Sequence, residues 1–138
     1  MKFSFGSKSE IAISGCHPFL QEIARKTLSH GIMDFAIIEG YRPDRLQHEY
    51  FIAGKSKVDA GNQMAKHNQR PALAFDAMPY INGKGSWNQL HCCVLAGIIL
   101  ATAKMSGYEL RWGGDWNQDG EPITDQDFQD LVHFELNN

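Results

Sequence analysis

Two short segments of the 138-residue chain combine histidine with aspartate in a way that suits metal chemistry. The first contains His67 and Asp76, and the second contains Asp130 and His133. Two imidazoles and one carboxylate are the kind of nitrogen and oxygen ligands with which proteins hold catalytic zinc. Such a site keeps a fourth position for water, and the spare carboxylate, Asp130, can serve as general base. The pattern predicts a metal-dependent hydrolase.

The period of a β-strand predicts where these side chains point. In a strand predicted over Leu131–Leu136, alternate apolar residues face the core, while His133 and Glu135 face the opposite side. Asp76 belongs to a strand predicted over Ala72–Met78 and shares its face with alanines, whose small side chains leave room for a metal and a substrate. The loop before that strand supplies the other histidine. We therefore expect the ligands on open faces.

Hydrophobic periodicity and turn residues predict the elements around these segments. The predicted helices are Pro18–His30, Asp44–Ala53 and Asn88–Met105, and the further strands are Phe35–Glu39 and Tyr108–Trp112. A glycine follows each helix closely, which is a usual signal for a helix end. Because helices and strands do not alternate regularly, an α+β fold in one domain over residues 1–138 is favoured over a wound parallel sheet.

Polar and turn-forming residues predict the connections. Residues 55–70 are polar and are expected to form a loop over the site. Pro79 is expected to end the strand that carries Asp76, because proline has no N–H for the ladder. Asn82-Gly83 predicts a tight turn after it.

Composition and charge exclude several classes of protein. The net charge of -3 and the pI of about 6.0 give no reason to expect nucleic-acid binding. No run approaches the roughly 18 apolar residues of a membrane helix, and the N-terminus lacks the apolar core of a signal peptide. We therefore expect a protein made and folded in the cytoplasm, without stable membrane association. Three cysteines without a C-x-x-C pair predict buried thiols and no disulfide framework.

A second metal site is suggested by Asp115, Asn117 and Asp119, which are followed directly by a glycine. This spacing is similar to the start of an EF-hand loop, in which alternate residues supply oxygen ligands. The rest of the loop departs from that pattern, because Gln126 occupies the twelfth position, where an EF-hand has a bidentate glutamate. Two readings stay open: a weak Ca²⁺ site that orders the chain before Asp130, and an Asx-rich surface turn without an ion.

Several motifs, in order along nearly the whole chain, are similar to those of a known enzyme family. They are Asp34-Phe35, Glu39-Gly40-Tyr41-Arg42, Gln47, Tyr50, Gly54-Lys55-Ser56, Lys66-His67-Asn68, Ala74-Phe75-Asp76, Pro79–Gly83, Arg111–Trp116 and Asp130–Leu136. The chain resembles the zinc peptidases that cleave bacterial wall peptides, grouped with lysostaphin, the D-alanyl-D-alanine peptidases and the hedgehog signalling domain. Within that group it looks most like small phage endolysins that are L-alanyl-D-glutamate endopeptidases. The resemblance implies a hedgehog-like zinc fold, with a small, mostly antiparallel sheet and flanking helices.

The resemblance also implies a role for each matched residue. The implied zinc ligands are His67, Asp76 and His133. Asp130 would be the catalytic base, Arg42 would face the carbonyl or carboxylate of the substrate, and Gln47 would be a nearby polar contact.

Two positions depart from the family pattern. Eight residues separate His67 from Asp76, where many members have six, and Ala65 stands where a serine is common. The longer spacing changes the loop that carries His67. The alanine removes a hydroxyl that could form a hydrogen bond behind the ligand.

The function that the resemblance implies is hydrolysis of peptidoglycan. A zinc-dependent endopeptidase would cut the L-alanyl-D-glutamate bond of stem peptides during phage-induced lysis, after release to the wall by a holin. Its partner would be the stem peptide, and we expect a monomer. Two alternatives are a D-alanyl-D-alanine carboxypeptidase with the same chemistry, and a non-catalytic module that retains zinc for structure or binding.

Overall fold

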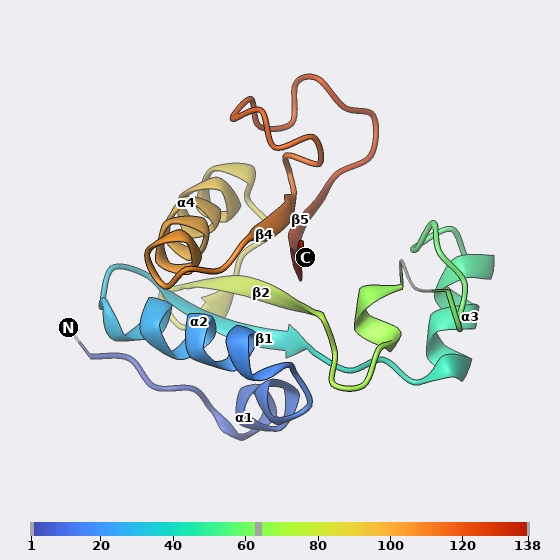
Figure 1. Ribbon diagram of the computed structural model, residues 1–138. Coiled ribbons are helices and arrows are strands. Elements are labelled where there is room, and N and C mark those ends of the chain that lie inside the picture. The colour runs from blue at the N-terminus through green and yellow to red at the C-terminus, as the bar shows by residue number, and fades with distance from the viewer. Residues whose placement is uncertain (1, 63–64, 138) are drawn as a thin grey trace.

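The computed structural model describes residues 2–62 and 65–137 (Figure 1). The helices are α1 (Ser7–Ser14), α2 (Pro18–Ser29), α3 (Asp44–Ile52) and α4 (Gln89–Met105), with a 3₁₀ turn, η1, at Lys66–Asn68. The strands are β1 (Asp34–Glu39), β2 (Ala74–Ile81), β3 (Lys84–Gly85), β4 (Leu110–Gly113) and β5 (Asp130–Leu136). Each strand pair is antiparallel, in the order β1-β2-β5-β4, with β3 beside β2. The predicted α+β class and antiparallel sheet are confirmed.

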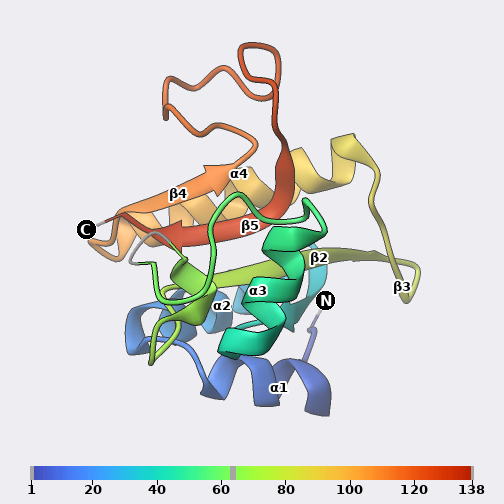
Figure 2. The same ribbon diagram turned by 90° about the vertical axis from the view of Figure 1, so that its right-hand side faces the viewer.

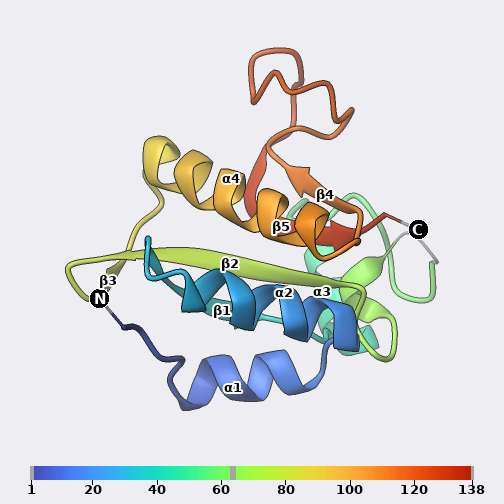
Figure 3. The same cartoon turned by 60° about the vertical axis from the view of Figure 1, so that its left-hand side comes forward.

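The helices lie on two sides of this sheet. Helices α2 and α4 cover one face and contact each other, as Figure 3 shows with both in front of the strands. Helix α3 and η1 lie before the opposite face, which is turned toward the viewer in Figure 2. Helix α1 packs against β1. The long loop between β4 and β5 extends beyond the sheet at the top of Figure 1.

The core lies between the sheet and helices α2 and α4. Phe75 on β2 is paired in register with Phe134 on β5, and the two rings pack 5.8 Å apart. Their fully buried neighbours from the helices are Leu20, Ile23, Leu95 and Ile99. Since strand residues alternate between faces, a core on this side leaves the residues beside Phe75 and Phe134 on the opposite, open face.

The predicted helices α2, α3 and α4 are confirmed within one or two residues of their expected ends. Pro18 begins α2, and His17 caps it by accepting a hydrogen bond from the Phe19 amide. Asn88 caps α4 in the same way. Helix α1 was not predicted from the sequence. Only two of its residues, Ser9 and Ile13, are buried, so it lacks the apolar stripe that marks an amphipathic helix.

The prediction that Pro79 ends its strand is wrong. Strand β2 continues to Ile81, and Pro79 is paired with Phe35 of β1. The carbonyl of Pro79 accepts a hydrogen bond from the Ser86 amide, so the polar groups of this residue point away from β1. The missing N–H of proline therefore removes no hydrogen bond between β1 and β2. The predicted turn follows, with Asn82 and its glycine neighbour at positive φ of 53° and 79°.

All three cysteines are free, with Cys16 and Cys92 buried and Cys93 half-buried. In the described ranges, no helix is long and apolar enough to cross a membrane.

Candidate metal centre and its cleft

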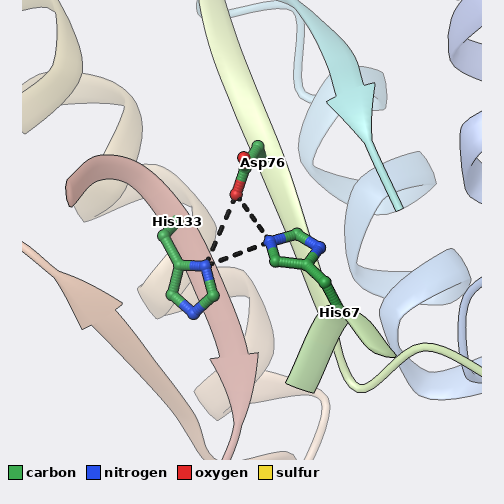
Figure 4. Close-up of side chains that lie close together, drawn as sticks. All are labelled: His67, Asp76 and His133. Carbon is green, nitrogen blue, oxygen red and sulfur yellow. Dashed lines mark hydrogen bonds and ion pairs between the residues drawn. The ribbon is translucent and has the colours of Figure 1, made fainter. Parts of the chain in front are cut away.

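The sheet register brings two of the predicted ligands together on the open face. Asp76 on β2 is paired directly with His133 on β5, and Oδ1 of Asp76 lies 3.4 Å from Nδ1 of His133. His67 on η1 completes the group, with its Nε2 2.9 Å from Asp76 Oδ1 and 3.2 Å from His133 Nδ1 (Figure 4). The donor atoms of the three side chains all lie within 4.8 Å of one another. Among the described residues, this is the one such group of metal-binding side chains.

Short contacts to the chain around Gly40 hold His67 in place. Its Nδ1 donates a hydrogen bond of 2.7 Å to the Gly40 carbonyl, and its own carbonyl accepts one of 2.7 Å from the Arg42 amide. A side chain at Gly40 would collide with the Ala12 carbonyl, so glycine allows the β1 end to approach α1 closely. The side-chain Nδ2 of the neighbouring Asn68 donates to the Arg42 carbonyl at 2.9 Å. The segment 55–70 was predicted as a loop, and η1 within it is the part that carries the ligand.

In both His67 and His133, one ring nitrogen is bonded to an outer partner and the other faces the centre of the group. Nδ1 of His67 is held by the Gly40 carbonyl, and Nε2 of His133 donates to Oε1 of Glu135 at 2.9 Å. In the neutral imidazole, the nitrogen that does not carry the proton has the lone pair. The bonded nitrogens therefore fix the tautomers that present His67 Nε2 and His133 Nδ1 to an ion, as outer partners of metal-binding histidines usually do. The residues present fit a metal ion with nitrogen and oxygen ligands.

Charge interactions within the group favour the ionised carboxylate. Burial opposes the charge of Asp76, but the adjacent imidazoles outweigh it and hold the pKa of this carboxyl well below its ordinary value. Burial also opposes the charge of His133, whose bonds to Asp76 and Glu135 nevertheless raise its pKa to about 9. The ionised carboxylate is ready to bind a cation, whereas at neutral pH His133 must release a proton before its nitrogen can bind one.

A cavity of about 320 Å³ opens onto this group and gathers the other predicted site residues. Asp130, Arg42 and Gln47 all line it, together with His67 and His133. Asp130 is the first residue of β5, paired with Gly113 of β4. Its half-buried carboxylate makes no hydrogen bond within the part of the chain that the structure describes.

Arg42 and Gln47 reach the cavity as a bonded pair. Nη1 of the buried Arg42 donates to Oε1 of Gln47 at 2.9 Å, while Nε and Nη2 bind Glu39. A guanidinium has five N–H groups, so these bonds leave two for a ligand. The Gln47 amide is almost completely buried, and its Nε2 donates to Ser56 Oγ at 3.0 Å. Gln47 therefore fixes Arg42 and the segment that carries Ser56.

Several further residues of the cavity were not singled out as functional from the sequence, and four of them are aromatic or charged residues from β4, β5 and the loop between them. Trp116 and Phe128 form one wall, with stacked rings 6.3 Å apart, and Trp116 also contacts the His133 ring at 5.7 Å. Glu135 and Arg111 are bonded at 3.0 Å and lie across β5 and β4 in register. Strand parity alone identifies Glu135, which shares its face with His133. The wall residues come from the long loop before β5, whose path has no periodic signal.

The loop predicted as a second metal site shows the geometry of a surface turn. Oδ2 of Asp115 accepts a bond of 2.9 Å from the Gly120 amide, and the Asp119 amide donates to Oδ1 of Asn117 at 3.3 Å. Carboxylate and amide oxygens that already accept backbone N–H groups are those of Asx turns. Among the described residues of this loop, no three carboxylate, histidine or cysteine side chains bring their ligand atoms within 4.8 Å of one another, and Ca²⁺ has no support here.

Solved structures share this fold and identify the class. The crystal structure of Serratia marcescens L-Ala D-Glu endopeptidase ChiX is similar with a TM-score of 0.75 and 25% sequence identity. The similarity covers 99% of this chain and 90% of that chain. Fold and site together are those of a peptidase.

Sequence comparison identifies the family. The family model of the phage L-alanyl-D-glutamate peptidases matches residues 1–137. The L-alanyl-D-glutamate peptidase of Escherichia phage T5 is 34% identical over 122 residues, which are 88% of this chain and 87% of the phage T5 protein. The chain belongs to the phage L-alanyl-D-glutamate peptidase family, and the resemblance found in the sequence motifs is confirmed.

Proposed function

We propose that this peptidase is a zinc-dependent endopeptidase that hydrolyses the L-alanyl-D-glutamate bond of peptidoglycan stem peptides during phage-induced lysis. The observation that carries the proposal is the convergence of His67, Asp76 and His133 beside Asp130 in one cavity. The choice of the L-alanyl-D-glutamate bond is supported by the names of its relatives. We further propose that the enzyme acts on the bacterial wall after holin-type release, and that it is a monomer.

The donor set suits zinc. Two imidazole nitrogens and one carboxylate oxygen are a usual catalytic zinc set, and the group that the described residues form has this composition. Zinc bound there would lower the pKa of a water molecule and polarise the scissile carbonyl.

The residues of the chain supply the rest of the chemistry. Asp130 lines the cavity with an unbonded carboxylate, so it can take the proton of the attacking water and return it to the leaving amine. The two free N–H groups of Arg42 can donate to the carbonyl oxygen as negative charge develops there. Glu39 and Gln47 hold the guanidinium before the substrate arrives, which removes the cost of orienting it during the reaction.

Digestion of purified peptidoglycan, with and without a chelator, tests the proposal. New amino termini on glutamate, seen by mass spectrometry and lost with the chelator until zinc is restored, would support it. Release of D-alanine would instead indicate a carboxypeptidase. Zinc binding without cleavage would indicate a non-catalytic module.

The bond from Glu135 to His133 gives a prediction for metal affinity. In Glu135→Gln the shape of the side chain is kept, but a neutral oxygen replaces the carboxylate that fixes the His133 tautomer. We expect zinc affinity to fall about tenfold, the lower end for loss of such an outer partner. Competition with a coloured chelator measures it, and Glu121→Gln, at an exposed glutamate outside the cavity, is the control. Equal affinities in the two variants would contradict a positioning role.

The environment of Asp130 gives a prediction for pH. Burial first, and then the negative charge of Asp76, raise the pKa of the Asp130 carboxyl above its ordinary value. A bound zinc ion would lower this pKa again through its positive charge. In the metal-free protein the pKa of the Asp130 carboxyl should therefore lie above about 4, where an exposed aspartate titrates, and it should fall when zinc is added. NMR titration of this carboxyl with and without zinc measures both values, and a metal-free value at or below about 4 would contradict the prediction.

A further inference from the structure

Three lysines line the cavity without an ion-pair partner among the described residues. They are Lys55, Lys57 and Lys66. The two arginines of the lining, in contrast, are each paired with a glutamate. The chain as a whole carries a net charge of -3, so this group of unpaired cations is a local feature of the cleft. Unpaired cations at the mouth of a cavity attract an anionic group of the ligand.

Lys57 lines the cavity between two residues that are held by a buried side chain. Nε2 of the buried Gln47 donates to Ser56 Oγ at 3.0 Å and to the Val58 carbonyl at 2.5 Å, so both neighbours of Lys57 are fixed. Its Nζ lies 5.0 Å from the centre of the ring of Phe128, which also lines the cavity. The cation–π contact leaves the three N–H groups of the ammonium without a hydrogen-bond acceptor from the described chain.

The chemistry of an L-alanyl-D-glutamate peptide supplies such an anion. The scissile amide uses the amino group of the glutamyl residue and neither of its two carboxyls. The peptide continues through one of them, and the other is a free carboxylate at neutral pH, unless it is amidated. This carboxylate is therefore close to the scissile bond in every substrate of this class.

We propose that the lysine group, with Lys57 at its centre, binds the free carboxylate of the glutamyl residue and makes the enzyme selective for stem peptides in which this carboxyl is not amidated. The inference rests on the proposed function, because it assumes that the L-alanyl-D-glutamate bond lies in this cavity. Beyond the proposed function, it specifies that the glutamyl carboxyl of the substrate is free and that the three lysines recognise it.

The size of the effect follows from the exposure of the lysines. A solvent-exposed ion pair contributes up to about 1 kcal/mol, which corresponds to roughly fivefold in affinity. We expect the kcat/KM of the wild type for the free acid to exceed that for the amide by about fivefold, mainly through KM. The preference should shrink as salt is raised, because screening weakens exposed charge pairs.

The test uses three synthetic peptides that contain the L-alanyl-D-glutamyl bond and are cleaved by the zinc-loaded enzyme. In the first, the spare glutamyl carboxyl is free; in the second it is a primary amide. In the third it is free, but the carboxyl group at the C-terminus of the peptide is amidated. If the third peptide were cleaved as slowly as the second, the effect would depend on the total negative charge of the peptide and not on the glutamyl carboxylate, and the proposal would be overturned.

Variants locate the effect on the chain. In Lys57→Gln the ratio of kcat/KM between acid and amide should fall at least about twofold, and in the variant with all three lysines changed to glutamine it should approach one. Lys57→Arg keeps the charge and should keep the preference. Lys84→Gln, an exposed lysine of β3 outside the cavity, is the matched control.

The possible results separate this inference from the proposed function. Cleavage of the acid and the amide with equal kcat/KM by the wild type would overturn the inference and leave the proposed function standing. An unchanged preference in the triple variant would also overturn it. Failure of the zinc-loaded wild type to cleave any of the three peptides would overturn both.

Discussion

The Asp130→Asn variant is expected to bind zinc like the wild type and to turn over about a thousandfold more slowly, within the range of general acid–base catalysis. Asparagine has nearly the shape of aspartate but cannot take a proton from water. The lost function is therefore proton transfer, and the binding of metal and substrate should remain.

The surroundings of Asp130 explain why a single residue carries this effect. Its carboxylate lines the same cavity as His67 and His133, and the described chain gives it no hydrogen-bond donor. Gly113 of β4 packs directly against the backbone of Asp130. A Cβ atom at Gly113 would collide with the Asp130 carbonyl, so glycine allows this close packing. A fixed carboxylate without a protein partner is free to bind the water that it activates.

The measurement is kcat on an L-alanyl-D-glutamyl peptide, with zinc content determined in the same preparation. Asp127→Asn is the matched control, because Asp127 is exposed, outside the cavity and only three positions away. Turnover by Asp130→Asn at the rate of Asp127→Asn would remove Asp130 from the mechanism.

Strand parity was enough to predict the open face of the site. The alternation around His133 and Asp76 follows from the two-residue period of a strand, which is a local property of the chain. It placed both side chains opposite Phe134 and Phe75, as the structure has them. The helices were predictable for the same reason, since their caps and glycine stops are local signals.

The contacts between distant segments could not be predicted in this way. The pairing of Asp76 with His133 depends on the register of β2 against β5, which the tertiary packing fixes. The bond from His67 to the Gly40 carbonyl joins residues 27 positions apart. Gln47 supports the cleft from within the protein, and nothing in its local sequence distinguishes it from a surface glutamine. The sequence resemblance supplied these residues; the structure supplies their contacts.

The His133→Ala variant is expected to lose zinc and, with it, all measurable peptidase activity. Loss of an outer partner of a metal-binding histidine weakens affinity about 10- to 100-fold, and loss of one of three protein ligands should exceed that range. The substitution also leaves Asp76 and Glu135 without the imidazole to which both are bonded. Each carboxylate would then keep only its other partner, His67 for Asp76 and Arg111 for Glu135, so some loss of stability is expected as well.

Zinc affinity separates the ligand role from the loss of stability. Affinity is measured by chelator competition at a temperature where circular dichroism shows the variant to be folded. His91→Ala is the matched control, because His91 lies on α4, which covers the opposite face of the sheet from η1, and is bonded to Ser86, so this variant should bind zinc like the wild type. If His133→Ala were folded, inactive and still able to bind zinc with the affinity of His91→Ala, then His133 would act on the substrate instead of the metal. The pairing of Asp76 with His133 would then serve catalysis through charge alone, with the metal held elsewhere.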